Sequence, residues 1–175
     1  MKLYDAARCP YCARVRIALA EKQLDYETIE IDLGDRPRWI YDLNPTGRVP
    51  VLDDGFVLPE SEVIMAYLEE RYPDPALLPP DPETRAHARL LVHRFGDALT
   101  KDYYAFRRGD PNQLEERLAA LAVGVSLYSD FATIPWVLRA RDMLGLELPT
   151  HLEAWVEDLA QRPSVARELE VVAAL

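Results

Sequence analysis

The spacing of apolar and polar residues predicts a mixed α/β arrangement for the first part of the chain. Alternating or short apolar runs favour strands at residues 2–4, 26–33, 49–52 and 56–58. Helical spacing favours helices at residues 10–22, 37–41 and 61–72. Asp54-Gly55 between the last two strands is a strong hairpin signal. The order β-α-β-α-β-β-α indicates a parallel βαβ unit followed by a hairpin and a covering helix, hence a four-stranded sheet with helices packed on it.

The rest of the chain shows only helical periodicity. Runs at residues 83–107, 111–122, 129–144 and 151–161 have a spacing of about 3.6 residues, and Pro163 opens a short last helix. Five of the 14 prolines lie between Pro73 and Pro82, which indicates a semi-rigid linker. We therefore expect an α/β domain over 1–75, a linker over 76–82 and a small all-helical domain over 83–175.

Composition and charge narrow the class of protein. The 175 residues are 49% apolar and 29% charged, a globular mixture. The net charge of −10 disfavours a general nucleic-acid or anionic-membrane binder, although a local basic pocket could still take a small acidic substrate. No apolar stretch is long enough to span a membrane, and the N-terminal residues lack a signal-peptide pattern. We expect a cytoplasmic protein with no membrane or nucleic-acid partner.

The two cysteines lie together at Cys9-Pro10-Tyr11-Cys12, where a predicted strand gives way to a helix. At about the N-cap, Cys9 would be exposed to helix N–H groups and the positive end of the helix dipole, which lower a thiol pKa. Arg8 and Arg14 could add to this effect. Cys12 follows one turn later, within reach of a mixed disulfide on Cys9. We predict Cys9 as the attacking thiol and Cys12 as the resolving thiol.

Two other interpretations of the cysteines are weaker. A zinc site needs about four ligands, and neither a second CxxC nor ligand-spaced histidines accompany this pair, so we predict no metal. A zinc site bridging two copies of the chain stays open. Coincidental structural cysteines would not require the strand-to-helix position, whereas a CxxC beside a βαβ pattern is typical of redox chemistry.

Several motifs in register resemble the glutathione S-transferase superfamily. They are CPYC, RPRW, NPTGRVPVL, LPES and a helix ending YLEERYP; in the helical part they are DFATIPWVLRA and WVEDLAQRPSV. The first 75 residues resemble the thioredoxin-like domain of that superfamily, and CPYC is the form seen in glutaredoxins, including those built on the transferase fold. The resemblance covers nearly the whole chain and implies a thioredoxin-like domain followed by a shortened helical domain.

The resemblance also implies a glutathione site. Pro50 matches the family's cis-proline, which would let the backbone of Val49 bind the cysteinyl part of glutathione. Glu60 would bind the γ-glutamyl ammonium, and Ser61 with helix N–H groups would bind its carboxylate. Arg36, with Arg48 as a second candidate, would bind the glycyl carboxylate. Tyr11 of CPYC belongs with this set.

Each of these assignments has a structural alternative. Pro50 could simply begin an edge strand, Ser61 could be only a helix cap, and Arg36 and Arg48 could be solvated surface charges.

Some aromatic residues have two interpretations as well. Tyr103 and Tyr104 could line a second-substrate pocket beside Cys9 or belong to the core. For Trp136, and for Tyr4 at its strand end, we favour the core.

The helical domain departs from the family around residues 118–127. About 95 residues stand where the family usually has more than a hundred. The family opens its buried helix with a Ser/Thr-x-x-Asp box; here Leu127 stands three residues before Asp130, and Ser126 lies one residue early. A missing helical segment could open the pocket to larger substrates, including protein disulfides.

Three functions are compatible with the sequence. The first is a glutathione-dependent thiol–disulfide oxidoreductase or thiol transferase. The second is a glutathione transferase of the Cys type, acting on small electrophiles. The third is a non-catalytic binding module on the transferase fold. The 17 arginines and 3 lysines suggest a GC-rich genome, so another low-molecular-weight thiol could replace glutathione. The family usually forms homodimers, and we expect one here.

Overall fold

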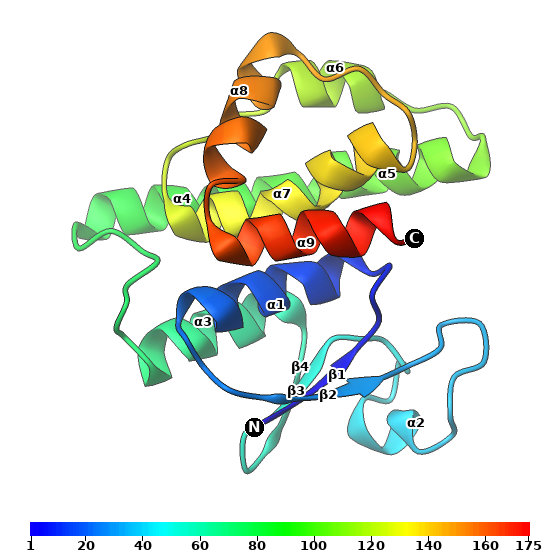
Figure 1. The fold of residues 1–175 in the computed structure, drawn as a ribbon, viewed down its shortest axis with the longest axis vertical. Coiled ribbons are helices and arrows are strands. Elements are labelled where there is room, and N and C mark those ends of the chain that lie inside the picture. Colours follow the sequence, from blue (N-terminus) through cyan, green and yellow to red (C-terminus); the bar gives the residue numbers. More distant parts are fainter. The chain divides into compact units, whose positions relative to one another are not determined.

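The chain folds into two compact units, Met1–Ala76 and Leu77–Ala174, each described by itself below (Figure 1). The structure is a computed structural model that describes residues 1–175, including every side chain except that of Asp97. In the described residues, no helix is both long enough and apolar enough to cross a membrane.

The first unit is a four-stranded sheet with three helices, in the predicted order. Its strands are β1 (Lys2–Asp5), β2 (Glu27–Glu30), β3 (Val51–Asp53) and β4 (Val57–Pro59). Its helices are α1 (Pro10–Glu21), α2 (Ile40–Leu43) and α3 (Ser61–Arg71). The strand order is β2-β1-β3-β4, with β1 parallel to β2 and the other pairs antiparallel. This is the thioredoxin-like arrangement predicted from the sequence.

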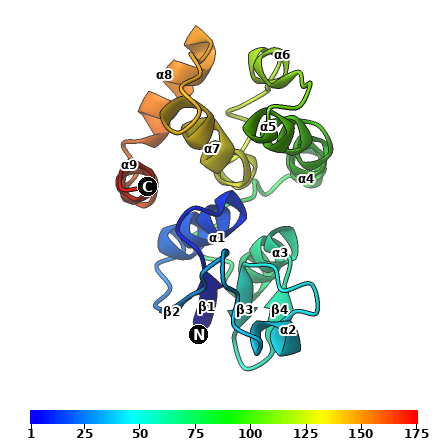
Figure 2. The same cartoon turned by 90° about the vertical axis from the view of Figure 1, so that its right-hand side faces the viewer.

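Helices α1 and α3 lie side by side on one face of the sheet (Figures 1 and 2). Their apolar faces are buried, with Leu19 of α1 and Leu68 of α3 fully covered. At the end of α1, Lys22 Nζ lies 2.7 Å from Glu69 Oε2 of α3. It also donates to the carbonyl oxygens of Tyr72 and Pro75, so this buried charge is fully engaged.

Two elements of the first unit differ from their predicted ranges. Strand β2 is shorter than the predicted 26–33, because after Ile31 N donates to Asp5 O the chain turns, with the Asp32 carboxylate accepting from Gly34 N. Helix α2 begins at Ile40 rather than 37, because a hydrogen bond from Ile40 N to Pro37 O forms a turn before it.

The hairpin between β3 and β4 forms as predicted. Gly55 has a φ of 84°, a conformation that glycine adopts without a steric cost, and its N–H donates to Asp53 Oδ1.

The second unit is helical throughout its described residues, and α7 runs through its centre. The helices are α4 (Pro82–Asp97), α5 (Leu99–Arg108), α6 (Leu114–Ala119), α7 (Leu127–Asp142), α8 (Thr150–Leu159) and α9 (Pro163–Ala173). Helix α7 packs against α4, α5 and α9 (Figure 2). Trp136 of α7 is fully buried, with its ring edge-to-face against Phe95 at 5.2 Å, so it belongs to the core.

The predicted helix over 83–107 is in fact two helices. Ala98, with φ −101° and ψ −74°, ends α4 and precedes α5. The predicted helix over 111–122 is also shorter, because the Asn112 carboxamide accepts from Leu114 N and fixes a turn before α6. Beyond α6, Gly124 has a φ of 76°, which marks a turn rather than a helix.

Helix α7 begins earlier than the family pattern suggests. Ser126 is its N-cap, and the Ser126 hydroxyl accepts from Ser129 N at 3.2 Å. Asp130 therefore does not serve the capping box; its carboxylate accepts from Gly124 N at 2.8 Å and fixes the preceding turn. Burial raises the pKa of Asp130, although the hydrogen bond from Gly124 opposes the shift.

Candidate active site

Cys9 occupies the junction between β1 and α1, as predicted. It is the N-cap residue of α1, with φ −83° and ψ 117°, and Pro10 is the first helical residue. Cys9 N donates to Ala6 O at 2.9 Å, which closes the turn after the strand. Cys9 is 8% exposed. Its chemical role remains a prediction.

Arg16 contacts the loop before Cys9, and the sequence did not predict this contact. Its Nη1 lies 2.6 Å from Asp5 Oδ1, and its guanidinium also donates to the carbonyl oxygens of Ala6 and Ala7. Asp5 and Arg16 are both largely buried, so this ion pair is shielded from water. The pair fixes the end of β1 relative to α1 and thereby the position of the Cys9 backbone.

Cys12 lies one turn into α1 and is fully buried. Both cysteines are thiols, with no disulfide between them. Burial raises the pKa of the Cys12 thiol well above its ordinary value. The hydrogen bond with Cys9 and the nearby negative charge of Asp5 act in the same direction. The Cys12 thiol therefore holds its proton at neutral pH.

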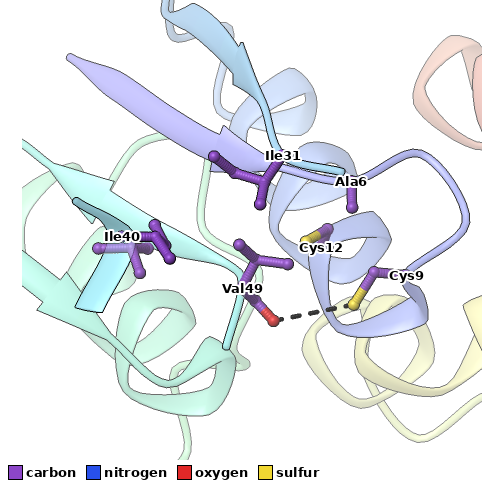
Figure 3. Packing of buried hydrophobic residues seen from close by; sticks show 7 residues of the cluster. Ala6, Cys9, Cys12, Ile31, Ile40 and Val49 are labelled. Atoms are coloured by element: carbon purple, nitrogen blue, oxygen red, sulfur yellow. Dashed lines mark hydrogen bonds between the residues drawn. The ribbon is translucent and has the colours of Figure 1, made fainter. Parts of the chain in front are cut away.

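The Cys9 side chain faces the turn that leads into β3. Cys9 Sγ donates to the carbonyl oxygen of Val49 at 3.8 Å, and the Val49–Pro50 peptide bond is cis, as predicted (Figure 3). Cys9, Cys12 and Val49 share one buried cluster with Ala6, Ile31, Ile40 and Val51. In the part of the chain that the structure describes, the Cys9 thiol does not cap the helix through its side chain. It donates to the backbone carbonyl of Val49.

Ser61 lies at the start of α3 and contacts α1. Arg14 Nη1 donates to Ser61 Oγ and to Glu62 Oε1, both at 3.3 Å. Ser61 is 6% exposed, and the Arg14 side chain is fully buried. Glu60, just before the helix, is exposed and has a φ of 72°. The predicted pair Glu60-Ser61 thus stands at a helix N-terminus, with a buried guanidinium beneath it.

Arg14 contacts Ser61, Glu62 and the ring of Tyr11, whose centroid is 5.6 Å from Arg14 Cζ. The expectation that Arg14 assists Cys9 stays a prediction. The sequence signal that could have indicated these contacts is a charged residue among the apolar residues of a helix. The other predicted cation, Arg8, is exposed on the loop before Cys9.

Arg36 and Arg48 are both exposed, on two loops of the first unit. The Arg36 guanidinium donates to Leu33 O at 2.9 Å. The carbonyl oxygen of Arg48 accepts from Asn44 Nδ2 at 2.9 Å, which fixes the turn ahead of Val49. Their assignment to a glycyl carboxylate remains a prediction.

Tyr103 and Tyr104 both belong to α5 in the helical unit. Tyr103 is buried and Tyr104 is half-buried, and their rings meet edge-to-face at 5.3 Å. Their use as a second-substrate pocket beside Cys9 stays a prediction. Across the described side chains, no three His, Cys, Asp or Glu residues converge as a metal ligand set.

The first unit matches the model of a known protein family. The model described as "Glutathione S-transferase, N-terminal domain" matches residues 3–76. Glutathione S-transferase omega-1 of Rattus norvegicus is 32% identical over 187 residues, covering 93% of this chain and 78% of the relative.

Other relatives match over a shorter part. Pyrimidodiazepine synthase of Drosophila melanogaster is 38% identical over 115 residues, which is 63% of this chain. The matched part is about half of that relative's length, 47%. Among solved structures, glutathione transferase Omega 1C from Trametes versicolor superposes with a TM-score of 0.83 and 26% identity, covering 99% of this chain and 93% of that one.

Proposed function

Because the chain belongs to the glutathione S-transferase superfamily, we propose that it is a glutathione-dependent thiol–disulfide oxidoreductase, or thiol transferase, with Cys9 as its nucleophile. The observation that supports this proposal best is the difference in environment between the two thiols. Both thiols are buried, but Cys9 is the N-cap residue of α1, whereas the pKa of the Cys12 thiol is raised well above its ordinary value. A pair in which only one thiol ionises readily has a defined attacking and resolving member.

The reaction is a series of thiol–disulfide exchanges. The Cys9 thiolate attacks one sulfur of a disulfide, forms a Cys9 mixed disulfide and releases the other sulfur as a thiolate. A glutathione thiolate or Cys12 then attacks that mixed disulfide and regenerates Cys9 or closes a Cys9–Cys12 disulfide. Along the Cys12 route, closing the Cys9–Cys12 disulfide releases the second substrate thiol, and two glutathione thiols in turn then reduce that disulfide; two glutathione molecules are thereby oxidised to one glutathione disulfide, and the substrate disulfide is reduced to two thiols.

In this proposal, glutathione binds to Val49, Glu60 and Ser61 of the first unit. Val49, whose carbonyl already meets Cys9, would bind the cysteinyl backbone as an added strand does. Glu60 is exposed for the γ-glutamyl ammonium, and Ser61 with the N-terminus of α3 suits the carboxylate.

Other residues complete the proposed site. Arg36 or Arg48 would bind the glycyl carboxylate, and Tyr11 would lie beside the bound tripeptide. Tyr103 and Tyr104 would belong to the second-substrate side.

A transferase of the Cys type, acting on small electrophiles, is the second candidate. It would use the same Cys9, and it is supported by the relatives, which include a glutathione S-transferase omega-1 and a pyrimidodiazepine synthase. Glutathione is the co-substrate in both proposals, and no metal takes part in either. A non-catalytic binding module would need neither thiol. We further propose a cytoplasmic homodimer, as is common in the family.

Three proteins test the proposal: wild type, Cys12→Ser and Cys9→Ser. Each is incubated with glutathione disulfide and analysed by intact mass. We expect Cys12→Ser to accumulate one glutathione adduct, the wild type to resolve it, and Cys9→Ser to form none. Thiolate absorbance against pH in Cys12→Ser reports the pKa of Cys9, which we expect below about 8.5.

Two activity assays distinguish the oxidoreductase from the Cys-type transferase. One measures reduction of a mixed disulfide, and the other measures conjugation of glutathione to an electrophile. Faster conjugation, abolished by Cys9→Ser, would favour the Cys-type transferase. An unshifted Cys9 pKa with no adduct in any variant would overturn both and leave a binding module.

A further inference from the structure

A buried ion pair lies at the junction of β1 and α1, close to the two thiols. Arg16 Nη1 lies 2.6 Å from Asp5 Oδ1, and the two side chains are 13% and 8% exposed. The ion pair at the other end of the same strand, Lys2–Glu27, is longer at 3.6 Å, and about half of each side chain is exposed. Water and salt screen the Lys2 pair far more than the Asp5 pair, so the charges of Asp5 and Arg16 act more strongly on neighbouring groups.

The Ala6 backbone connects this ion pair to both cysteines. Its carbonyl oxygen accepts from Arg16 Nη1 at 3.5 Å and from Cys9 N at 2.9 Å. A hydrogen bond from the Ala6 backbone also reaches the Cys12 thiol, and it lowers the pKa of that thiol. Figure 3 shows Ala6 and both cysteines in the same buried cluster. The ion pair therefore fixes the segment of backbone to which both cysteines are bound.

The negative charge of Asp5 also acts on Cys12. After burial and the contact with Cys9, this charge is a further cause of the raised pKa of the Cys12 thiol. The other side chains of the cluster are apolar, and the titratable residues packed against it are Tyr4 and Tyr11. Arg16 places a positive charge against Asp5 and so offsets the negative charge that disfavours ionisation of Cys12.

We propose that Asp5 and Arg16 are positioning residues of the resolving step, in which Arg16 offsets the Asp5 charge and thereby lets Cys12 ionise once Cys9 carries a mixed disulfide. This inference rests on the proposed function. In this step the Cys12 thiol gives its proton to water, and its thiolate attacks Cys9 Sγ. The Cys9–Cys12 disulfide forms, the bond from Cys9 to the substrate sulfur breaks, and the substrate leaves as a thiolate that takes up a proton.

Rapid-quench mass spectrometry after mixing with glutathione disulfide measures attack and resolution separately. Formation of the Cys9 adduct is followed in the Cys12→Ser background, and its conversion to the Cys9–Cys12 disulfide is followed with both cysteines present, each against pH. Asp5→Asn and Arg16→Gln each remove one charge, and the double variant removes both. Lys2→Gln is the matched control, because it breaks the exposed ion pair of the same strand. Circular dichroism confirms that each variant folds.

The charges predict an order for the pH at which resolution reaches half its maximal rate. Arg16→Gln leaves the Asp5 charge without its partner, so we expect this midpoint to rise by about one pH unit and resolution at neutral pH to slow several-fold. Asp5→Asn leaves only the positive charge and should give the lowest midpoint. The double variant should lie between the two single variants, and Lys2→Gln should match the wild type.

A purely structural ion pair gives a different result, because the double variant would then resolve the adduct no faster than the slower single variant. That result, equal midpoints in all variants, or a wild-type adduct that Cys12 does not resolve would overturn the inference. The proposed nucleophile would still stand if the Cys12→Ser protein forms its adduct, whereas absence of that adduct would overturn the proposed function.

A second measurement does not depend on catalysis. The thiolate absorbance of Cys12 against pH is compared in Cys9→Ser and in Cys9→Ser/Asp5→Asn. Removal of the Asp5 charge should move the absorbance rise to lower pH. An unchanged curve would overturn the inference whether or not the protein exchanges disulfides.

Discussion

Arg14 Nη1 lies 3.3 Å from Ser61 Oγ, a contact that joins α1 to the first residue of α3 across 47 positions of the chain. The Arg14 side chain is fully buried, so its charge acts in a medium that screens it weakly. Its carboxylate partner, Glu62, is half-exposed. A positive charge beneath the N-terminus of α3 adds to the helix dipole at the place proposed for the γ-glutamyl carboxylate.

Replacing Arg14 should therefore weaken glutathione binding more than it slows chemistry. In Arg14→Met the side-chain stem keeps most of its packing, but Ser61 loses its donor and the helix N-terminus loses its charge. We expect the KM for glutathione to rise about tenfold, a typical effect of losing one charge-assisted interaction, with a smaller change in kcat. Steady-state kinetics over glutathione concentration measure this split.

Two control variants test whether the effect comes from the charge of Arg14. Arg14→Lys retains the charge and should restore part of the affinity, whereas Arg71→Gln, an exposed arginine at the other end of α3, should change neither constant. Equal losses in Arg14→Lys and Arg14→Met would show that packing, not charge, is what Arg14 provides. A kcat that falls as far as kcat/KM would contradict a role in binding.

The sequence predicted those parts of the fold that depend on neighbouring residues. Gly55 predicted the hairpin, and Cys9 with Pro10 predicted the start of α1, because turns and helix caps depend on neighbouring residues. The two helices on either side of Ala98 were predicted as one helix, because the apolar spacing continues across the break. The break itself lies in the backbone dihedral angles of Ala98, which the apolar spacing does not reveal. The length of helix α6 was overestimated, because the apolar periodicity extends into the turn that the Asn112 side chain fixes before the helix.

Contacts between distant segments were harder to predict. Arg14 is a charge near Cys9 in sequence, and the structure shows that it also donates to Ser61 and Glu62 of α3. Arg16 gave no sequence signal at all, because only the folded chain places Asp5, at the end of β1, beside this residue of α1. The cis-proline and Ser61 were found through resemblance, not through periodicity. Sequence reasoning thus located the candidate thiols and left their supporting ion pairs to the structure.

Ser126→Ala should destabilise the helical unit. The Ser126 hydroxyl caps α7 by accepting from Ser129 N, and α7 carries the buried centre of that unit. Loss of such a cap costs about 1 kcal/mol of unfolding free energy. Ser126→Asp, which keeps an acceptor, should retain most of the stability in urea denaturation. A Ser126→Ala midpoint equal to that of the wild type would contradict the capping role.

Acid should unfold the first unit partly through Asp54. Hydrogen bonds from the hydroxyls of Tyr67 at 2.7 Å and Tyr72 at 2.8 Å lower the pKa of this carboxyl from 3.8. A lowered folded pKa adds stability above the unfolded pKa, and that stability is lost as pH falls through the folded pKa.

Tyr67→Phe tests that linkage. Because Asp54 is partly exposed, the variant should cost about 1 kcal/mol near neutrality. The difference from the wild type should shrink as the pH falls below about 4. Urea midpoints across that range measure it, and a difference independent of pH would exclude the linkage. Val63→Ala, a change at an exposed residue of the same helix, is the control.

Alkaline pH should destabilise the fold through Cys12. Burial, then the contact with Cys9, raises the pKa of this thiol, so the folded chain keeps a proton that the unfolded chain has already lost. The sign follows directly: stability is complete below the unfolded pKa of about 8.5 and falls as the pH rises toward the folded pKa. Under reducing conditions, the urea midpoint of the wild type should therefore fall between about pH 8 and about pH 10.

The test compares three proteins over that pH range. Cys12→Ala should be less stable at neutral pH, because it removes a buried sulfur, but its midpoint should fall less steeply. Cys9→Ser should keep most of the wild-type slope, because burial, the largest cause of the Cys12 shift, remains. Parallel slopes for the wild type and Cys12→Ala would show that Cys12 does not titrate differently in the folded chain, and would remove the physical basis for assigning it as the resolving thiol.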